Sequence, residues 1–225
     1  MPDADFNALK PSLIQTTLEH NQVVSEPGTP VESVYFPVTA ILSVITLMDD
    51  GQGVEACTMG FENAYGLVNA LGSPIATERV IAQVPGLSFR VPTARLRAAA
   101  AHSPALTDLM VRHIQSMLAQ IEQSVACNVL HPLEARLCRW LLMSQDRTAN
   151  GILPLTQEFL GFMLGVQRTS VTIAARALQA AGLIRYSRGQ IAIVDRPGLE
   201  EGACECYASV QLKQEQLFSD RPRLR

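Results

Sequence analysis

The sequence of 225 residues lacks the features that mark membrane and secreted proteins. No run approaches 18 apolar residues, so no membrane-spanning helix is expected. The first residues, MPDADFNALKP, are acidic and lack the basic segment and apolar core of a secretory signal. The cysteines number five and are scattered, which is typical of a reduced intracellular protein rather than a disulfide scaffold. These absences predict a protein of the cytoplasm that has no membrane partner.

Motifs of the common enzyme classes are also missing. The chain contains no G-x-S-x-G, no P-loop, no H-E-x-x-H and no dinucleotide fingerprint. The carboxylates of DDGQGVE, residues 49–55, fall in an expected turn, where they suit solvation better than catalysis. We therefore expect no catalytic residue, and an enzyme is the less favoured class of protein.

Positive charge is scarce in the first part of the chain. Residues 1–131 hold 6 Lys and Arg against 12 Asp and Glu, a charge of −6. Residues 132–225 hold 12 against 9, a charge of +3, and nearly all of these basic residues are arginine. Such a division is typical of an acidic sensing or packing domain joined to a module that binds a polyanion. A chance imbalance of surface charge is the alternative.

The first half of the chain is rich in short strand patterns. Residues 7–20 predict a short helical start, after which β-branched stretches such as SVYFPV, AILSVITLM and ERVIAQV alternate with turn signals across residues 22–92. This spacing predicts an antiparallel sandwich or barrel. MDDGQGVE predicts a hairpin, because Asp-Gly supplies the positive φ of a tight turn.

From Ser103 to about Asn128 the pattern becomes helical, with Ser103-Pro104 as its start. Alternating spacings of four and three produce a heptad-like seam. The seam consists of Met110, Ile114, Met117, Ile121, Ser124 and Asn128. A seam of this length between two domains favours a parallel helix pair and a homodimer; the alternative is a long core helix of a monomer. NVLHP, residues 128–132, then predicts a break and hinge, because a residue before proline is pushed out of the α region.

The helix expected after Pro132 is amphipathic, with Trp140 inward and Arg136 and Arg139 outward. Residues 153–196 then predict helix, turn, helix and hairpin. Thr156 is placed to cap the first helix and Gly165 to make the turn. Gly182 ends the second helix, and Arg188-Gly189 forms the tip of the hairpin. This order is that of a winged helix-turn-helix.

In that motif the head of the second helix faces base edges in the major groove of double-stranded DNA. Arg168 suits guanine, Ile173 suits a thymine methyl, and Arg176 and Arg188 suit phosphates or flanking bases. An ordinary helical hairpin with solvated arginines is the alternative. The residues expected to contact DNA are Thr156, Gln167, Arg168, Thr169, Ser170, Thr172, Ile173, Arg176 and Arg188.

Over essentially its whole length the chain resembles the Crp/Fnr family of bacterial transcription regulators. The resemblance rests on YFP…DG…VE, on LHPLEARLCRWLL and on LTQEFLGFMLGVQRTSVTIAARALQAAGLI. It implies an α+β fold with a jelly-roll-like, cyclic-nucleotide-binding-like antiparallel β-roll over residues 1–102. A dimerisation helix and hinge follow over 103–131, and a winged helix-turn-helix over 132–225. It also implies a homodimer on a near-palindromic DNA site and contact with RNA polymerase.

The sequence departs from the family pattern at the reading end of the motif. Arg168 matches the first of three base-reading side chains, but Thr169 and Ile173 stand where the family usually has Glu and Arg. This departure predicts a half-site different from that of the best-known members.

The nucleotide-binding pattern is also altered. Members that bind cyclic nucleotides carry a Glu and an Arg-Ser pair; here Asn63 or Ala64 stands at the Glu, and Val80 follows Arg79. Cyclic AMP is therefore not expected, and we expect another effector near Asn63 and Arg79, or none. Arg79 alone could still pair with an anion. A cyclic-nucleotide-responsive regulator of the same fold remains an alternative.

Sensing through a metal or through redox chemistry is less favoured. No cysteine precedes Cys57, which argues against the N-terminal iron–sulfur cluster of some members. Cys204 and Cys206 are too close for an ordinary disulfide and lack partner ligands in the sequence pattern, so no cofactor and no metal site is expected. Haem ligation and a redox role for these cysteines stay open, as does a protein-interaction module that uses the seam. The candidate haem ligands are His20, His102, His113 and His131.

Overall fold

The computed structural model describes residues 1, 3–148 and 151–219. The chain divides into two compact units, the first made of Met1–Val44, Met59–Ala119 and Gln214–Arg225, and the second of Ile45–Thr58 and Gln120–Lys213. The division thus falls within the long helix, not at the expected hinge near residue 131. The hairpin end formed by Ile45–Thr58 and the part of the long helix from Gln120 onward belong to the same unit as the helix-turn-helix. Residues 220–225 of the expected DNA-binding domain lie outside the described residues.

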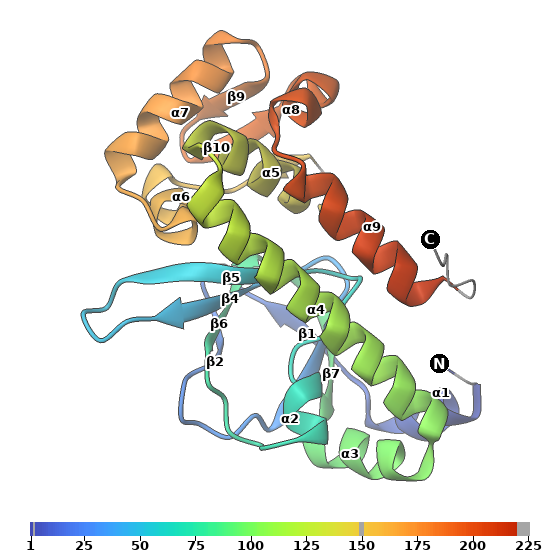
Figure 1. The fold of residues 1–225 in the computed structure, drawn as a ribbon. Helices are drawn as coiled ribbons and strands as arrows, with labels where there is room; N and C mark the ends of the chain where they lie inside the picture. Colours follow the sequence, from blue (N-terminus) through green and yellow to red (C-terminus); the bar gives the residue numbers. More distant parts are fainter. Residues whose placement is uncertain (2, 149–150, 220–225) are drawn as a thin grey trace. The chain divides into compact units, whose positions relative to one another are not determined.

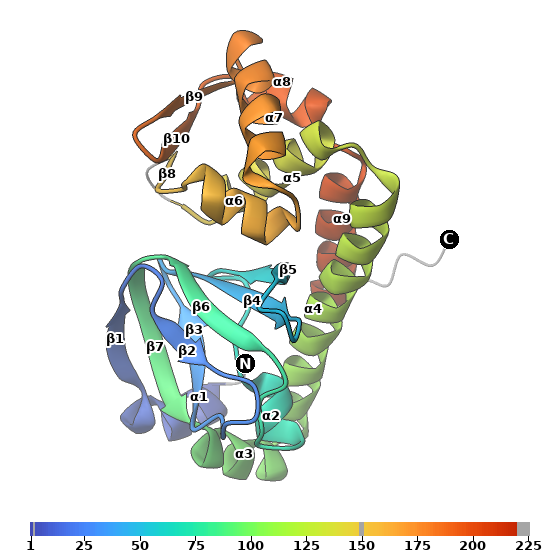
Figure 2. The same cartoon turned by 90° about the vertical axis from the view of Figure 1, so that its left-hand side faces the viewer.

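Figure 1 labels most of the elements up to the end of the long helix, and β3 is labelled in Figure 2. In chain order they are α1 (Asp3–Leu9), the 3-10 helix η1 (Lys10–Ser12), β1 (Ile14–Leu18), β2 (Val23–Ser25), β3 (Ser33–Pro37), β4 (Ile41–Leu47), β5 (Gly53–Met59), α2 (Leu67–Leu71), β6 (Arg79–Val84), β7 (Gly86–Pro92), α3 (Thr93–His102) and α4 (Pro104–Leu130).

The strands form the antiparallel β-roll that the sequence predicts. One sheet has the order β1-β7-β3 and the other the order β2-β6-β4-β5. Helices α1 and α3 gather at one end of this roll (Figure 2). Side chains from strand and helix share one core, in which Val34, Leu96 and Leu106 are almost fully buried. Burial of such side chains stabilises the fold by about 1.5–3 kcal/mol each.

The expected helix over residues 7–20 is wrong beyond Ser12, where the 3-10 helix η1 ends. Ile14–Leu18 is a strand that pairs with β7, from Ile14 opposite Arg90 to Leu18 opposite Gly86. Pro11 has no amide hydrogen to continue a helix, and the β-branched residues that follow favour an extended chain. Helix α3 was not predicted, yet its Leu96 lies in the core.

Sequence signals at the other element ends are confirmed. Gly51 takes a φ of 83° in the turn between β4 and β5, where the Met48 amide donates to the Gln52 carbonyl at 2.8 Å. Ser103 caps α4, because its hydroxyl accepts from the Leu106 amide at 3.1 Å. Helix α4 ends at Leu130, two residues before the proline that forbids its continuation.

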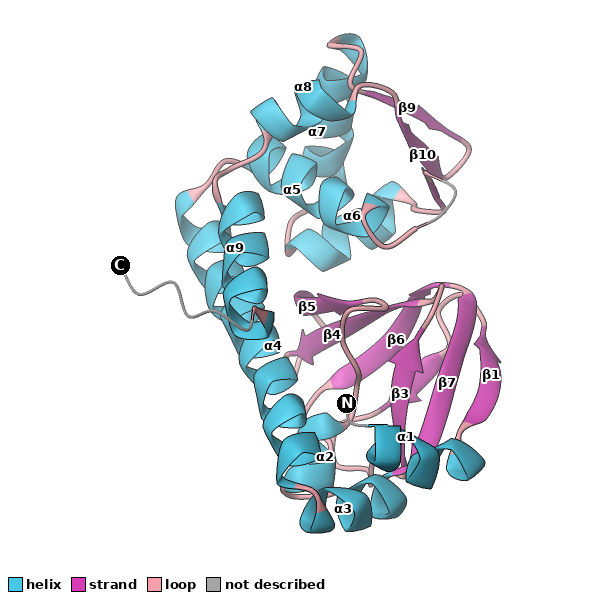
Figure 3. Ribbon diagram, turned by 90° about the vertical axis from the view of Figure 1, so that its right-hand side faces the viewer, coloured by secondary structure: helices cyan, strands magenta, loops and turns pink. Residues whose placement is uncertain are grey.

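The remaining elements lie in the second unit, apart from the end of the last helix (Figure 3). They are α5 (Leu133–Gln145), β8 (Ile152–Leu153), α6 (Gln157–Leu164), α7 (Arg168–Ala180), β9 (Ile184–Ser187), β10 (Gln190–Ile193), α8 (Arg196–Gly202) and α9 (Cys206–Phe218). The wing is a three-stranded sheet of order β8-β10-β9, one short strand more than the predicted hairpin. Helices α8 and α9 lie beyond the segment that the sequence patterns assign.

Within the described residues, no helix combines the length and the apolar character needed to cross a bilayer.

Candidate DNA-binding site

Helix α6 begins and ends where the sequence places its signals. The Thr156 hydroxyl accepts from the Phe159 amide at 3.1 Å, which satisfies one of the unpaired amides of the first turn. Gly165 ends the helix with φ 65° and ψ 39°, a left-handed conformation that favours glycine. Leu160 and Leu164 are buried. The helix is therefore fixed at both ends before the chain turns into α7.

Helix α7 packs through small side chains. Val171, Ala174, Ala175 and Leu178 form its buried stripe, as predicted. Close approach also depends on Gly161 of α6, where an added Cβ would stand 2.9 Å from the Val166 carbonyl oxygen. The sequence reasoning missed this glycine, although a glycine inside a helical pattern is a signal of close backbone contact.

The opposite face of α7 is open. Arg168, Thr169 and Arg176 are exposed, and the Ile173 side chain is 67% exposed. Across the part of the chain that the structure describes, no carboxylate lies within ion-pair distance of Arg168 or Arg176. An exposed isoleucine between unpaired arginines presents both charge and an apolar contact, the combination that base edges and phosphates require.

Three further predicted contacts have local structural roles. The Thr172 hydroxyl lies 2.7 Å from Gln157 Oε1 and 2.9 Å from the Arg168 carbonyl oxygen, so it ties α7 to α6. Thr156 is occupied as the cap of α6. Gln167 is exposed at the cap position of α7, and its carbonyl accepts from the Ser170 amide at 3.0 Å. Gln167 and Ser170 thus stand at the head of the helix beside Arg168.

The wing presents its own arginines. Arg188 and Gly189 both have positive φ, 50° and 73°, which matches the tight turns that join antiparallel strands. Arg188 is exposed at this tip, and Arg185 is exposed on β9. The sequence reasoning missed Arg185, although its place in an alternating strand predicts an outward side chain. The Tyr186 amide donates to Gln179 Oε1 at 2.8 Å, which joins the wing to the end of α7.

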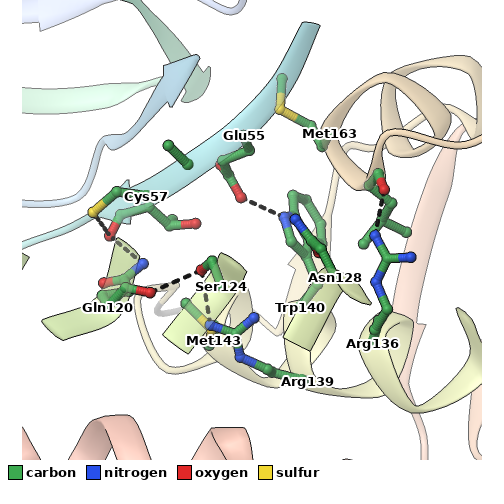
Figure 4. A pocket seen from close by; sticks show the side chains of 13 residues that line it. Glu55, Cys57, Gln120, Ser124, Asn128, Arg136, Arg139, Trp140, Met143 and Met163 are labelled. Atoms are coloured by element: carbon green, nitrogen blue, oxygen red, sulfur yellow. Dashed lines mark hydrogen bonds between the residues drawn. The ribbon is translucent and has the colours of Figure 1, made fainter. Parts of the chain in front are cut away.

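Arg136 and Arg139 are buried, contrary to the prediction that they face solvent. The Arg136 guanidinium donates to the Leu164 carbonyl at the C-terminal end of α6, and Arg139 donates to the Ser124 hydroxyl at 3.1 Å. Both line a pocket of the second unit (Figure 4). A cation at a helix C-terminus meets the negative end of the helix dipole, which offsets part of the cost of burial. Burial nevertheless lowers the pKa of Arg136.

The single tryptophan shares this pocket and is buried, as predicted. Its indole nitrogen donates to Glu55 Oε2 at 2.6 Å (Figure 4). Gln120 of α4 donates to the Thr58 carbonyl oxygen at 3.2 Å. The β5 end of the hairpin is therefore held to α4 and α5 by buried polar contacts.

The predicted seam of α4 is only partly exposed. Met110 lies in the core of the first unit and Ile114 packs against that core, because the β-roll covers this side of the helix. Large apolar side chains one position further along are exposed instead. They are Val111, Leu118, Val125 and Val129, with exposures of 40%, 51%, 62% and 79%. Among the other predicted seam residues, Asn128 is exposed, and Met117, Ile121 and Ser124 are half-buried.

Asn63 and Arg79 are not brought together. Asn63 lines an apolar cavity of the first unit, and its amide lies 3.5 Å from the His113 carbonyl oxygen. Arg79 does not line this cavity and pairs with Glu26 at 2.8 Å. The structure therefore does not bring the two residues together, and a carboxylate of the chain already pairs with the arginine; their joint role in holding an effector stays a prediction. Burial lowers the pKa of His113, whose ring is tilted by 49° against that of Phe218, with the ring centroids 4.6 Å apart.

Cys204 and Cys206 do have partner ligands, contrary to the sequence argument. Cys127 and His131 lie beside them, and the four ligating atoms are all within 4.8 Å of one another. Neither partner is near in sequence, so no local spacing pattern could reveal the group. Burial raises the pKa of the Cys127 and Cys204 thiols.

Residues 135–201 match the family model of the Crp-like helix-turn-helix domain. These residues are a Crp-like helix-turn-helix domain. The matched range contains most of α5, all of α6, α7 and the wing, and most of α8. The sequence resemblance is confirmed: the chain combines this Crp-like domain with an antiparallel β-roll, which is the architecture of Crp/Fnr-type regulators.

Similar proteins extend this likeness beyond the Crp-like domain. The chain is 23% identical over 186 residues to the global nitrogen regulator of Nostoc sp. (strain PCC 7120 / SAG 25.82 / UTEX 2576). The aligned part covers 79% of this chain and 83% of the relative. The fold of this chain is similar to that of FixK2 from Bradyrhizobium japonicum, with a TM-score of 0.72 and 19% identity. The match covers 85% of this chain and 98% of FixK2. A Crp/Fnr regulator from Eubacterium rectale gives a TM-score of 0.71 at 18% identity, with coverage of 89% and 94%.

Proposed function

We propose that this protein is a sequence-specific, DNA-binding transcription regulator of the Crp/Fnr type, acts in the cytoplasm, and has no catalytic activity. The observation that carries the proposal is the open head of α7. Arg168, Thr169 and Ile173 are exposed there, while the opposite face is packed into the Crp-like domain. The positive charge of residues 132–225 supplies the attraction for the phosphate backbone.

Roles for the exposed side chains follow from their chemistry. Arg168 at the helix head suits guanine O6 and N7, and the methyl groups of Ile173 suit the methyl of thymine. Arg176, further along the same face, and Arg188 and Arg185 of the wing suit phosphates. Phosphate contacts fix position on the duplex, so sequence preference rests on Arg168, Thr169 and Ile173. Contact with RNA polymerase is part of the same proposal.

A homodimer completes the proposed DNA-binding unit. Val111, Leu118 and Val125 recur every seven residues along α4, and all three are exposed on the single chain. Such a row suits a second copy of the same helix, since knobs at heptad spacing fill the holes of a partner helix. Two recognition helices would then address half-sites separated by about 34 Å, one turn of duplex. The near-palindromic site is a consequence of this two-fold arrangement.

Selection of binding sites from a pool of random duplexes tests the proposal. We expect an inverted repeat, and an affinity that falls steeply as salt concentration rises. Sequence-independent binding, or the absence of binding, would contradict the regulator function.

Arg168→Ala tests the assignment of the reading residue. Loss of one bidentate arginine–guanine contact costs about 1–3 kcal/mol, and the proposed dimer loses two such contacts. Affinity for the selected site should therefore fall by about 2–6 kcal/mol, roughly 30- to 25,000-fold. Preference should relax at one base position of each half-site. The control Arg95→Ala removes an equal charge from an exposed position on α3 and should leave the selected sequence unchanged. If Arg168→Ala weakens all sequences equally, Arg168 contacts phosphate instead.

A further inference from the structure

Four metal-ligating side chains meet in the second unit although they come from distant parts of the chain. Cys127 lies in the last part of α4, and His131 follows that helix by one residue. Cys204 lies between α8 and α9, and Cys206 begins α9. The contact between Cys127 and Cys204 joins residues 77 apart, and that between His131 and Cys206 joins residues 75 apart.

The spacing of the ligating atoms matches one tetrahedral ion. The sulfurs of Cys127 and Cys204 are 3.5 Å apart, and Cys206 Sγ is 3.4 Å from His131 Nδ1. A zinc ion with Zn–S bonds of about 2.3 Å and Zn–N bonds of about 2.0 Å places its tetrahedral ligand atoms about 3.5–3.8 Å apart. The sulfurs are too far apart for a disulfide, which needs about 2.05 Å. All four ligating atoms lie within 4.8 Å of one another, so the group closes around an ion through small side-chain shifts.

The neighbours of the ligands orient them as a metal site requires. His131 presents Nδ1 to Cys206, while its Nε2 lies 3.2 Å from Glu205 Oε1. A carboxylate on the far nitrogen of a ligating histidine fixes its tautomer and the orientation of its ring. The Gln123 amide donates to Cys206 Sγ at 3.1 Å, which fixes the direction in which this sulfur points.

Burial and charge agree with this arrangement. Cys127 and Cys206 have no exposed surface and Cys204 is 8% exposed, so the ligand set is shielded from solvent. Three thiolates and a neutral imidazole around a divalent ion carry a net charge of −1. The nearby guanidinium groups of Arg136 and Arg139 provide compensating positive charge. A buried cluster of cysteines acting only as small apolar groups does not account for a histidine aimed at a thiol and held from behind by a carboxylate.

We propose that Cys127, His131, Cys204 and Cys206 bind one divalent ion of the zinc class in a closed tetrahedral site. Binding replaces three thiol protons by the ion, and the imidazole contributes its lone pair without losing a proton. No position is left for water or substrate, so the ion is structural. It would fix the start of α9 to the end of α4, two segments that the figures show side by side (Figures 1 and 3).

The first test measures the metal content of the full chain, purified with a thiol reductant and without chelator. Elemental analysis should give one zinc per chain. After removal of zinc, titration with Co²⁺ should produce the visible bands of tetrahedral cobalt and the charge-transfer band of sulfur ligands, saturating at one equivalent. Zinc should then displace the cobalt. Reduced, folded protein that binds neither ion would overturn the proposal, as would iron accompanied by inorganic sulfide.

Variants locate the ion. Cys204→Ser should lose stoichiometric zinc and the sulfur charge-transfer band of cobalt. Cys138→Ser is the matched control, because Cys138 is also buried in the second unit but lies outside the group; it should keep one zinc. Equal loss of zinc in both variants, or full retention in Cys204→Ser, would contradict the site.

A conservative variant keeps the test decisive if Cys204→Ser does not fold. His131→Cys retains four ligands, and it should bind one cobalt with a stronger sulfur charge-transfer band than the parent chain. Addition of zinc should raise the melting temperature of the metal-free parent and of this variant. A folded His131→Cys chain that binds no cobalt, or whose sulfur band does not grow, would refute a role of His131 as ligand.

Discussion

Replacement of Gly165 by alanine tests how the turn of the helix-turn-helix is held. Gly165 has φ 65° and ψ 39°, and an alanine in this left-handed conformation costs about 1–2 kcal/mol. The added Cβ would also stand 3.2 Å from Val54 Cγ2, on the hairpin end that belongs to the same unit. Carbon atoms prefer about 3.5–4.0 Å, so this contact adds roughly 1 kcal/mol of overpacking. The free energy of unfolding should therefore fall by about 2–3 kcal/mol.

The single tryptophan makes the measurement specific to this unit. Trp140 is buried and bonded to Glu55 at 2.6 Å, so its fluorescence reports unfolding of the packing around the Crp-like domain. Urea denaturation should show a lower midpoint for Gly165→Ala. A loss of 2–3 kcal/mol lowers the melting temperature by about 4–12 °C in a chain of this length.

Gly182→Ala separates the backbone strain of the left-handed conformation from the overpacking against Val54. Gly182 has φ 78°, and an added Cβ would meet no atom within 4 Å, so this variant suffers only the backbone strain of about 1–2 kcal/mol. Combining Gly165→Ala with Val54→Ala should recover roughly 1 kcal/mol as a coupling energy. If Gly165→Ala is no less stable than Gly182→Ala and shows no coupling to Val54, the contact with Val54 does not contribute to the loss of stability. An unchanged midpoint for Gly165→Ala would refute the strain as well.

Two other variants test the start of α6 and the proposed dimer. Thr156→Ala removes the cap of the Phe159 amide and should lower the free energy of unfolding by about 1 kcal/mol, measured by urea denaturation with Trp140 fluorescence. The control Thr169→Ala, at an exposed position, should lower it by less than half of that. Equal losses would show that the cap is not the source of the effect. Leu118→Asp places a charge in the exposed heptad row of α4 and should halve the mass found by sedimentation without lowering the helix content, and a parent chain that sediments as a monomer would contradict the dimer.

Local chemistry made most of the Crp-like domain predictable. The cap at Thr156, the turn at Gly165 and the wing tip at Arg188 each depend on neighbours within a few residues, and each is where the sequence places it. The exposed face of α7 follows from the same helical period, since burial of Val171 and Leu178 leaves Arg168 outside. These features need no knowledge of the rest of the chain.

Features that depend on distant parts of the chain were missed or misassigned. Arg136 was expected outside because charged residues are seldom buried, yet the carbonyl of Leu164 at the end of α6 provides a partner. The α4 seam was placed one position away from the exposed row, because the period alone does not reveal which side the β-roll covers. The family's Arg-Ser pattern makes Arg79 an effector candidate, but its contact with Glu26, 53 residues earlier, could not be recognised from the sequence.

The hydrogen bonds that hold the Crp-like domain together involve other residues than those proposed to read the DNA sequence. Thr172 ties α7 to α6, Gln179 ties the wing to the end of α7, and Arg136 holds the carbonyl end of α6. None of these groups needs the exposed side chains of Thr169 and Ile173, which lie on the open face. Under the proposed function, substitution at those two positions should therefore change the recognised half-site while the orientation of the helix stays fixed. Thr169 and Ile173 can therefore depart from the family pattern while the architecture of the domain stays the same. We expect a new operator preference to arise from these two residues.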